Sequence, residues 1–288
     1  MFIIENHMIT GVTEINLLTA KVPDGIIAIS DNAFRDCKKL QIIDFPESLT
    51  SIGNHAFSGC ESLTKVNLST VTSIGEQAFF GCSSLTEVTL GEKIGYLCKS
   101  VFEGCTSLHA ITLPHNITYI GCECFKDCTS LAQIDLGEVM EIDNNAFEHC
   151  SELCTLILPK SLMHISQNAF SFCSSLSSVM AQNRFIDIDE TAFENTVNLI
   201  FKAVQFSTSY EYAQLQGYRF VPAVVEERHR VITSEQVAAL KAAKIMFQMK
   251  ALSGEKAIIR YDEGQRMEIE KVIGRDDSIK QERREEDG

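Results

Sequence analysis

The sequence predicts a solenoid of the α/β repeat class. It has eight stacked repeats of mostly short parallel strands with turns and short helical segments, a cap at each end, and a C-terminal helix and β-hairpin. Seven Cys residues stand three positions after Phe, a Leu stands six after each Phe, and Ile or Leu stands five before. Four columns in register over eight repeats are not a chance pattern. The Phe residues are spaced 22 or 23 apart, at Phe34, Phe57, Phe79, Phe102, Phe125, Phe147, Phe170 and Phe193.

Each part of the repeat has a predicted role. A unit of this length is too short to bury its own apolar face, so stacked units must share one core. The alternation in Leu63–Leu68 predicts a strand with Val66 and Leu68 inward, which pairs in parallel with the next turn. Ser51-Ile52-Gly53 is expected on the opposite side, where Gly allows a tight turn. The Ala-Phe-x-x-Cys segment is expected to form a short helical turn at the edge.

The repeat Cys-x-Ser-Leu-x-x-Val-x-Leu followed by Ile-Gly-x-x-Ala-Phe-x-x-Cys, which residues 60–82 show well, resembles the BspA-like leucine-rich repeat. The match runs from about residue 22 to about residue 200. Residues 2–27 resemble the entry turn of such arrays, and residues 199–221 resemble the terminating unit with a short helix. The resemblance therefore implies a leucine-rich-repeat solenoid with capping units over residues 1–222. Members of the family are known as surface-associated binding and adhesion proteins.

Residues 223–288 lack the repeat. A capping box at Thr233 predicts a helix over residues 234–252, and its apolar surface must be covered. We expect it to pack on the last turn of the solenoid; the alternative is a partner or a second copy, which would make the chain a self-associating scaffold. Residues 257–261 and 266–272 predict a β-hairpin. From about residue 274 the chain is charged and is expected to be disordered.

Composition excludes several classes of protein. Among the 288 residues, 45% are hydrophobic, too many for a disordered chain, and no apolar run is long enough to span a membrane. The formal charge is −14, of which −13 falls on residues 1–222, so nucleic acid and membrane are disfavoured as partners. Acidity is therefore expected on the binding surface, which favours a basic protein partner. The first residues lack a basic and apolar leader, which predicts a cytoplasmic protein.

The cysteines that stand three residues after Phe form a column, and their side chains are expected to be buried and to fill the core. Thiols that point in parallel neither surround a metal ion nor come close enough to form disulfides. The remaining four, Cys98, Cys122, Cys124 and Cys154, are also expected to be structural, although Cys98 or Cys122 at a column edge could be exposed and reactive. Seven scattered His residues form no known catalytic or nucleotide-binding motif. We expect no enzymatic activity, no metal and no cofactor.

The outward strand positions are the best candidates for partner binding, because they do not repeat whereas the core positions do. We predict a non-catalytic protein-interaction module that binds through this strand-lined face. The alternatives are a solvated face without a partner and a cell-surface adhesion or structural protein. Ile157 and Met180, on adjoining turns, are expected to form a small apolar patch. The candidate residues are Ile42, Asp44, Lys65, Asn67, Glu87, Thr89, Thr112, Gln133, Asp135, Thr155, Ile157, Ser178 and Met180, with Ala110 in the same columns.

Overall fold

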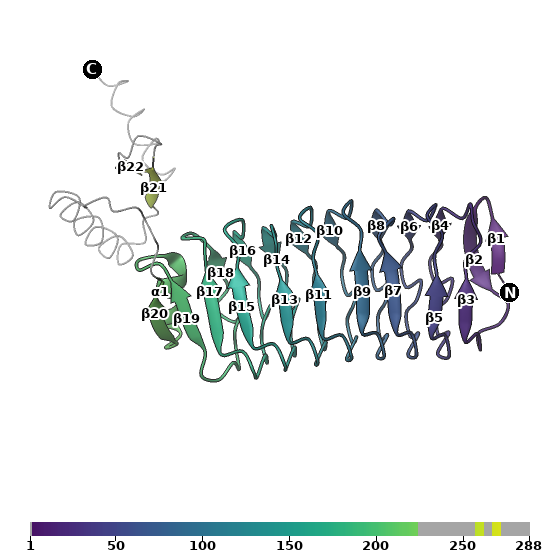
Figure 1. The fold of residues 1–288 in the computed structure, drawn as a ribbon. Coiled ribbons are helices and arrows are strands. Elements are labelled where there is room, and N and C mark those ends of the chain that lie inside the picture. Colours follow the sequence, from purple (N-terminus) through teal and green to yellow (C-terminus); the bar gives the residue numbers. More distant parts are fainter. Residues whose placement is uncertain (1, 224–256, 262–266, 272–288) are drawn as a thin grey trace, which may run out of the picture. The chain divides into compact units, whose positions relative to one another are not determined.

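Two rows of short strands, called the long-strand sheet and the short-strand sheet below, run along the repeat region, and each turn contributes one strand to each row (Figure 1). The computed structural model describes residues 2–223, 257–261 and 267–271. The chain divides into two units, Met1–Val225 and Glu226–Gly288, and the first is a solenoid of about 9 turns. The predicted stack of parallel strands is therefore confirmed.

The long-strand sheet holds the strands that follow each Leu of the repeat. Paired strands are parallel and in register, with Val66 opposite Val88, and the pairing is interrupted after Leu90 and after Asp135. Exposed and buried residues alternate along β7, so one face of this sheet forms the core and the other faces solvent. Its strands are β3 (Thr19–Lys21), β5 (Ile42–Asp44), β7 (Lys65–Leu68), β9 (Glu87–Leu90), β11 (Ala110–Thr112), β13 (Gln133–Asp135), β15 (Thr155–Leu158), β17 (Ser178–Ala181), β19 (Ile200–Ala203) and β20 (Arg219–Pro222).

The short-strand sheet lies on the other side of the core, and its strand pairing is interrupted after Ile74. Its strands inside the repeats are two residues long, and each buries or partly buries its second residue, an Ile or Leu. At the N-terminal end, β1 pairs antiparallel with β2 and so differs from the parallel strands that follow. The strands are β1 (Phe2–Glu5), β2 (Met8–Val12), β4 (Ala28–Ile29), β6 (Ser51–Ile52), β8 (Ser73–Ile74), β10 (Tyr96–Leu97), β12 (Tyr119–Ile120), β14 (Glu141–Ile142), β16 (His164–Ile165) and β18 (Asp187–Ile188).

A column of stacked phenylalanines fills the core between the two sheets. All eight repeat phenylalanines are fully buried. Neighbouring rings lie 4.9–5.7 Å apart between centroids and within 16° of parallel. The Leu column of the repeat is also buried, as Leu63 and Leu131 illustrate. Each turn thus buries its apolar residues against the turns before and after it.

Gly53 follows a short strand at a point where two turns approach closely. A Cβ on Gly53 would lie 2.6 Å from the backbone nitrogen of Asp31 in the preceding turn, closer than Cβ atoms come in real structures. Its φ is not in the left-handed region. Gly53 is therefore needed for the close approach of neighbouring backbones. Its carbonyl also accepts a hydrogen bond from the N–H of Ala56 at 3.4 Å, so it opens a turn, as expected.

The Ala-Phe-x-x-Cys segments are turns, and the prediction that they are short helical segments is wrong. The N–H of Phe34 donates to the carbonyl of Ala56 in the next turn of the solenoid at 2.8 Å. In an α-helix, this N–H would instead donate to the carbonyl of the residue four positions earlier in the sequence. Residues with a positive φ, in the left-handed backbone conformation, prevent the segment from continuing as a right-handed helix. They recur two residues after each Phe, at Asp36, Gly59, Gly81, Gly104, Asp127, His149, Phe172 and Asn195.

Substitution of Gly104 by alanine should test this left-handed column. Gly104 has φ +72°, and a Cβ there would meet Gly81 at an ordinary 3.6 Å, so strain would come from the backbone conformation alone. We expect G104A to lower the free energy of unfolding by about 1–2 kcal/mol. The matched control is Gly95→Ala, because Gly95 lies outside the left-handed region and its Cβ would meet only an oxygen at 4.0 Å. Urea denaturation followed by circular dichroism measures both, and equal losses would contradict the explanation.

The C-terminal end of the solenoid is closed by helix α1 (Thr208–Leu215), which begins with Ser207 accepting a hydrogen bond from the N–H of Tyr210. Its buried Tyr212 lies against Phe193 and Phe201, with centroids 6.1 and 5.7 Å away. This contact covers the end of the phenylalanine column. The short helix implied by the resemblance is thus present at the expected place.

In the second unit, β21 (Ala257–Tyr261) pairs antiparallel with β22 (Met267–Lys271), and Ile259 lies opposite Ile269. These strands match the predicted hairpin. The predicted helix over residues 234–252 and the charged tail lie outside the described residues.

Candidate functional site

The outward side of the long-strand sheet, called the strand-lined face below, carries the predicted partner-binding residues. Because side chains alternate along each strand, every second residue of these strands faces solvent. All of the candidates are exposed except Ser178, which is half-buried. Parallel register places them in two columns across the sheet, so that Lys65 lies beside Glu87 and Asn67 beside Thr89.

One apolar patch stands on this face near its C-terminal end. Ile157 on β15 lies opposite Met180 on β17, and their exposed fractions are 53% and 38%. The predicted adjacency of these two residues is confirmed. Two strands further on, Val221 occupies the same column with Lys202 between, and it is 37% exposed. Ile157, Met180 and Val221 are called the apolar patch below.

Other candidate residues are less distinctive. Ile42 is exposed but lies between Thr19 and Lys65, so it joins no apolar neighbour in its column. The side chains of Asn67 and Asp135 each accept a hydrogen bond from the backbone N–H two residues on, at 3.1 and 3.0 Å. These two side chains therefore have a local structural role at the ends of their strands.

The strand-lined face is mixed in charge. Lys21 lies beside Asp44, as Lys65 lies beside Glu87, and Lys202 and Arg219 lie near the C-terminal end. The expectation that the acidity of the solenoid belongs to this face is therefore wrong. The excess acidic residues lie outside the strands of this sheet, since its acidic residues are only Asp44, Glu87 and Asp135.

The seven cysteines of the repeating column are buried, as predicted. The thiol of Cys60 donates to the carbonyl of Phe34 in the preceding turn at 3.2 Å, and the same contact recurs at 3.1–3.4 Å in the following repeats. Burial raises the pKa of Cys82 and Cys173 to about 12. These thiols are protonated at neutral pH and serve as small hydrogen-bonding core residues.

The cysteines outside the column differ in exposure. Cys98 and Cys122 are half-buried, Cys124 is buried, and Cys154 is exposed. Burial, with nearby acidic residues, raises the pKa of the Cys98 and Cys122 thiols. A raised pKa disfavours the reactive thiolate form of Cys98 and Cys122. The thiol of Cys154 donates to the carbonyl of Glu152 at 3.1 Å.

In the part of the chain that the structure describes, no three side chains of His, Cys, Asp or Glu are grouped so that they could hold a metal ion. The described residues also contain no helix of the length and apolarity needed to cross a bilayer.

Comparison with known proteins gives one family and several solved structures. The model of the BspA type leucine rich repeat region matches residues 12–132 and 97–218. A leucine-rich repeat protein from Bacteroides ovatus is 26% identical with a TM-score of 0.57, and the match covers 68% of this chain and 58% of that one. A Leucine Rich Repeat protein from T. pallidum is 29% identical with a TM-score of 0.54, covering 59% of this chain and 82% of that one. No curated protein matches the chain.

Proposed function

Because the chain belongs to the BspA-type leucine-rich repeat family, we propose that it is a non-catalytic module that binds another protein through its strand-lined face. Repeats of this family generally mediate protein interaction or surface adhesion and are generally non-catalytic. The chain spans 58% of the length of the Bacteroides structure it resembles, so the proposal concerns this chain alone.

The apolar patch is the observation that carries the proposal. Core positions repeat from turn to turn because packing dictates them, whereas packing leaves the outward positions free. Ile157, Met180 and Val221 place three apolar side chains along one outward column, with the stem of Lys202 between two of them. Exposed apolar groups with a polar rim are typical of protein-binding surfaces.

The mixed charge of the face also bears on the partner. Lys65 and Glu87 alternate in sign across neighbouring strands, so the face offers no single-sign field to attract a strongly basic protein. We propose instead a partner that inserts an apolar side chain at the patch and surrounds it with polar contacts. The strength of capture should therefore depend more on the patch than on salt concentration.

Charge substitution at the patch tests this function. We expect Ile157→Asp combined with Met180→Asp to weaken partner capture by the full chain at least tenfold, because loss of central apolar contacts costs about 1–2 kcal/mol or more. Quantitative pull-down from native lysate, read by mass spectrometry, measures the effect.

The matched control is Ile27→Asp. Ile27 is 47% exposed, similar to Ile157, but it precedes a strand of the other sheet. Capture that survives in the control and is lost in the double variant supports the proposal. Unchanged capture by the double variant would exclude the apolar patch as the binding site.

A further inference from the structure

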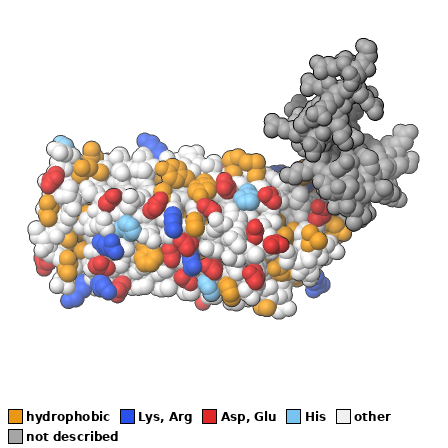
Figure 2. Space-filling model, turned by 180° about the vertical axis from the view of Figure 1, so that it is seen from behind, with side chains coloured by type: hydrophobic (Ala, Val, Ile, Leu, Met, Phe, Trp, Pro, Cys, Tyr) orange, Lys and Arg blue, Asp and Glu red, His pale blue; other side chains and the backbone are white. Residues whose placement is uncertain are grey.

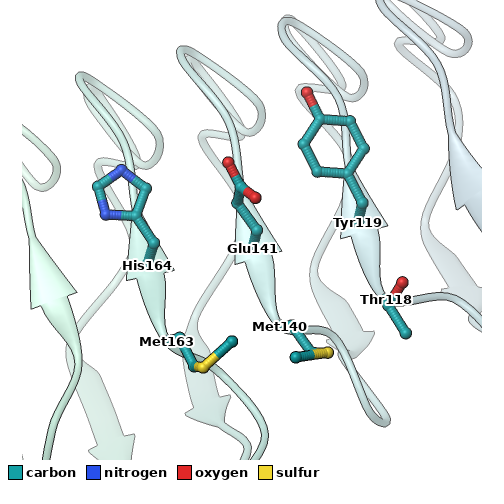
Figure 3. A pocket seen from close by; sticks show the side chains of 6 residues that line it. All are labelled: Thr118, Tyr119, Met140, Glu141, Met163 and His164. Atoms are coloured by element: carbon teal, nitrogen blue, oxygen red, sulfur yellow. The ribbon is translucent and has the colours of Figure 1, made fainter.

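A shallow hollow of about 240 Å³ lies on the short-strand sheet, away from the strand-lined face (Figure 3). Its lining comes from three consecutive turns. Tyr119, Glu141 and His164 form one row on β12, β14 and β16, because they are register partners in parallel strands. Thr118, Met140 and Met163, each one residue earlier, form a second row beside them (Figure 3).

Both rings of the first row are held by acidic side chains. The Tyr119 hydroxyl donates to the carboxylate of Asp143 at 2.6 Å. Burial and this hydrogen bond raise the pKa of Tyr119, so its hydroxyl stays protonated. The Nδ1 atom of His164 lies 3.1 Å from the carboxylate of Asp187. The two rings therefore stand as fixed walls on either side of Glu141.

Glu141 differs from its neighbours because its carboxylate has no hydrogen bond or ion pair within the described residues. It is exposed and stands between an aromatic ring and an imidazole (Figure 3). His164 is the one lining residue that can carry a positive charge, and Asp187 already faces it. The hollow thus has an uncompensated negative charge.

The second row gives the hollow an apolar wall. Met140 and Met163, each directly before a strand, are 38% and 51% exposed and lie on neighbouring turns, so that together they form a small apolar surface. Methionine adapts its shape to a ligand and packs well against alkyl chains and ring systems. Figure 2 shows acidic and hydrophobic side chains interspersed over one face of the solenoid. A ligand for this hollow must therefore combine a cation with an apolar stem.

We propose that the hollow binds an arginine side chain presented by a partner protein. The guanidinium would stack on Tyr119 and pair with the Glu141 carboxylate, while its methylene stem would lie on Met140 and Met163. Arginine suits these walls better than lysine, because its planar, weakly hydrated cation stacks on aromatic rings and forms bidentate carboxylate contacts. The site is separate from the strand-lined face, so the two proposals fail independently.

The test uses the full chain labelled with carbon-13 at the methionine methyl groups. N-acetyl-arginine amide is titrated, with N-acetyl-lysine amide and the neutral isostere N-acetyl-citrulline amide in parallel. Met→Leu variants assign the signals of Met140 and Met163. We expect weak, saturable shifts of these two signals with the arginine probe, smaller shifts with lysine, none with citrulline, and weaker binding as salt rises.

A charge-neutral variant gives the decisive comparison. Glu141→Gln should lower the affinity for the arginine probe by about fivefold, as expected for loss of an exposed ion pair. Glu138→Gln, an exposed glutamate of the same turn that does not line the hollow, should leave the affinity unchanged. Equal response to lysine or citrulline, no saturable shift, or binding unaffected by Glu141→Gln would each overturn the proposal.

Discussion

Replacement of Phe125 by alanine is expected to lower the free energy of unfolding by about 3–5 kcal/mol. Phe125 is fully buried and is stacked between Phe102 and Phe147, with centroids 5.5 and 5.2 Å away. Removal of the ring would leave a cavity that these two neighbours cannot fill, because each is held by the next ring in the column. Urea denaturation followed by circular dichroism measures the loss.

Phe80→Ala is the matched control. Phe80 follows a phenylalanine of the column, but its side chain is 37% exposed. We expect its replacement to change stability by about 0.5 kcal/mol or less, as for most surface sites. Similar losses for F125A and F80A would show that the stacked column is not the source of stability.

Alkaline solution is expected to unfold the repeat region cooperatively, because the buried cysteine thiols must remain protonated in the fold. Burial raises the pKa of Cys82 to about 12, whereas an unfolded thiol titrates near 8.5. Above the unfolded pKa, the unfolded chain releases a proton that the folded chain retains. Stability is therefore intact below about pH 8.5 and falls as pH rises toward 12.

Several buried thiols contribute to this effect in the same direction. At pH 10, Cys82 alone should cost about 2 kcal/mol, since each pH unit above the unfolded pKa costs about 1.4 kcal/mol. The pKa values of the other column cysteines, including Cys105 and Cys150, are also raised by burial, so their losses have the same sign.

Circular dichroism and thiolate absorbance, recorded together in reducing buffer during an alkaline titration, check this prediction. The two signals should change together. Cys82→Ala should make stability fall less steeply with pH, because the unfolded chain then releases one proton fewer. Thiolate formation by the buried column cysteines in a chain that keeps its circular dichroism would contradict the prediction.

The core could be predicted from the sequence because packing makes it repeat. Phe125, Leu131 and Cys128 occupy columns whose spacing alone indicates a stacked turn, and the structure buries all three. The adjacency of Ile157 and Met180 follows from the same register. Val221 was missed because its strand lies only 19 residues after Lys202, where the repeat spacing has already ended.

The backbone of the turns was harder to predict. Three glycines in the left-handed column, such as Gly104, point to that conformation, but His149 and Phe172 hold it without a glycine. Their rings stack 4.6 Å apart, a contact between turns that no single repeat reveals. A helical expectation for this segment relied on local pattern, whereas hydrogen bonds to the next turn decide its conformation.

The hollow beside Glu141 could not be predicted either. Tyr119, Glu141 and His164 share one outward column, but nothing in their spacing distinguishes them from other solvated positions. Their importance arises from what holds them, namely the contacts of Tyr119 with Asp143 and of His164 with Asp187. Such contacts depend on side-chain conformation, which the repeat does not determine.

The backbone ladder between turns has a consequence for how the chain reaches its fold. The hydrogen bond from Phe34 to Ala56 spans 22 residues, and the thiol contact from Cys60 to Phe34 spans 26. Because contacts reach only the adjacent turn, average contact order stays the same however many turns are stacked. Folding can therefore start at any pair of neighbouring turns and propagate outward. A gene duplication that adds one whole turn between the caps would lengthen the protein without slowing its folding.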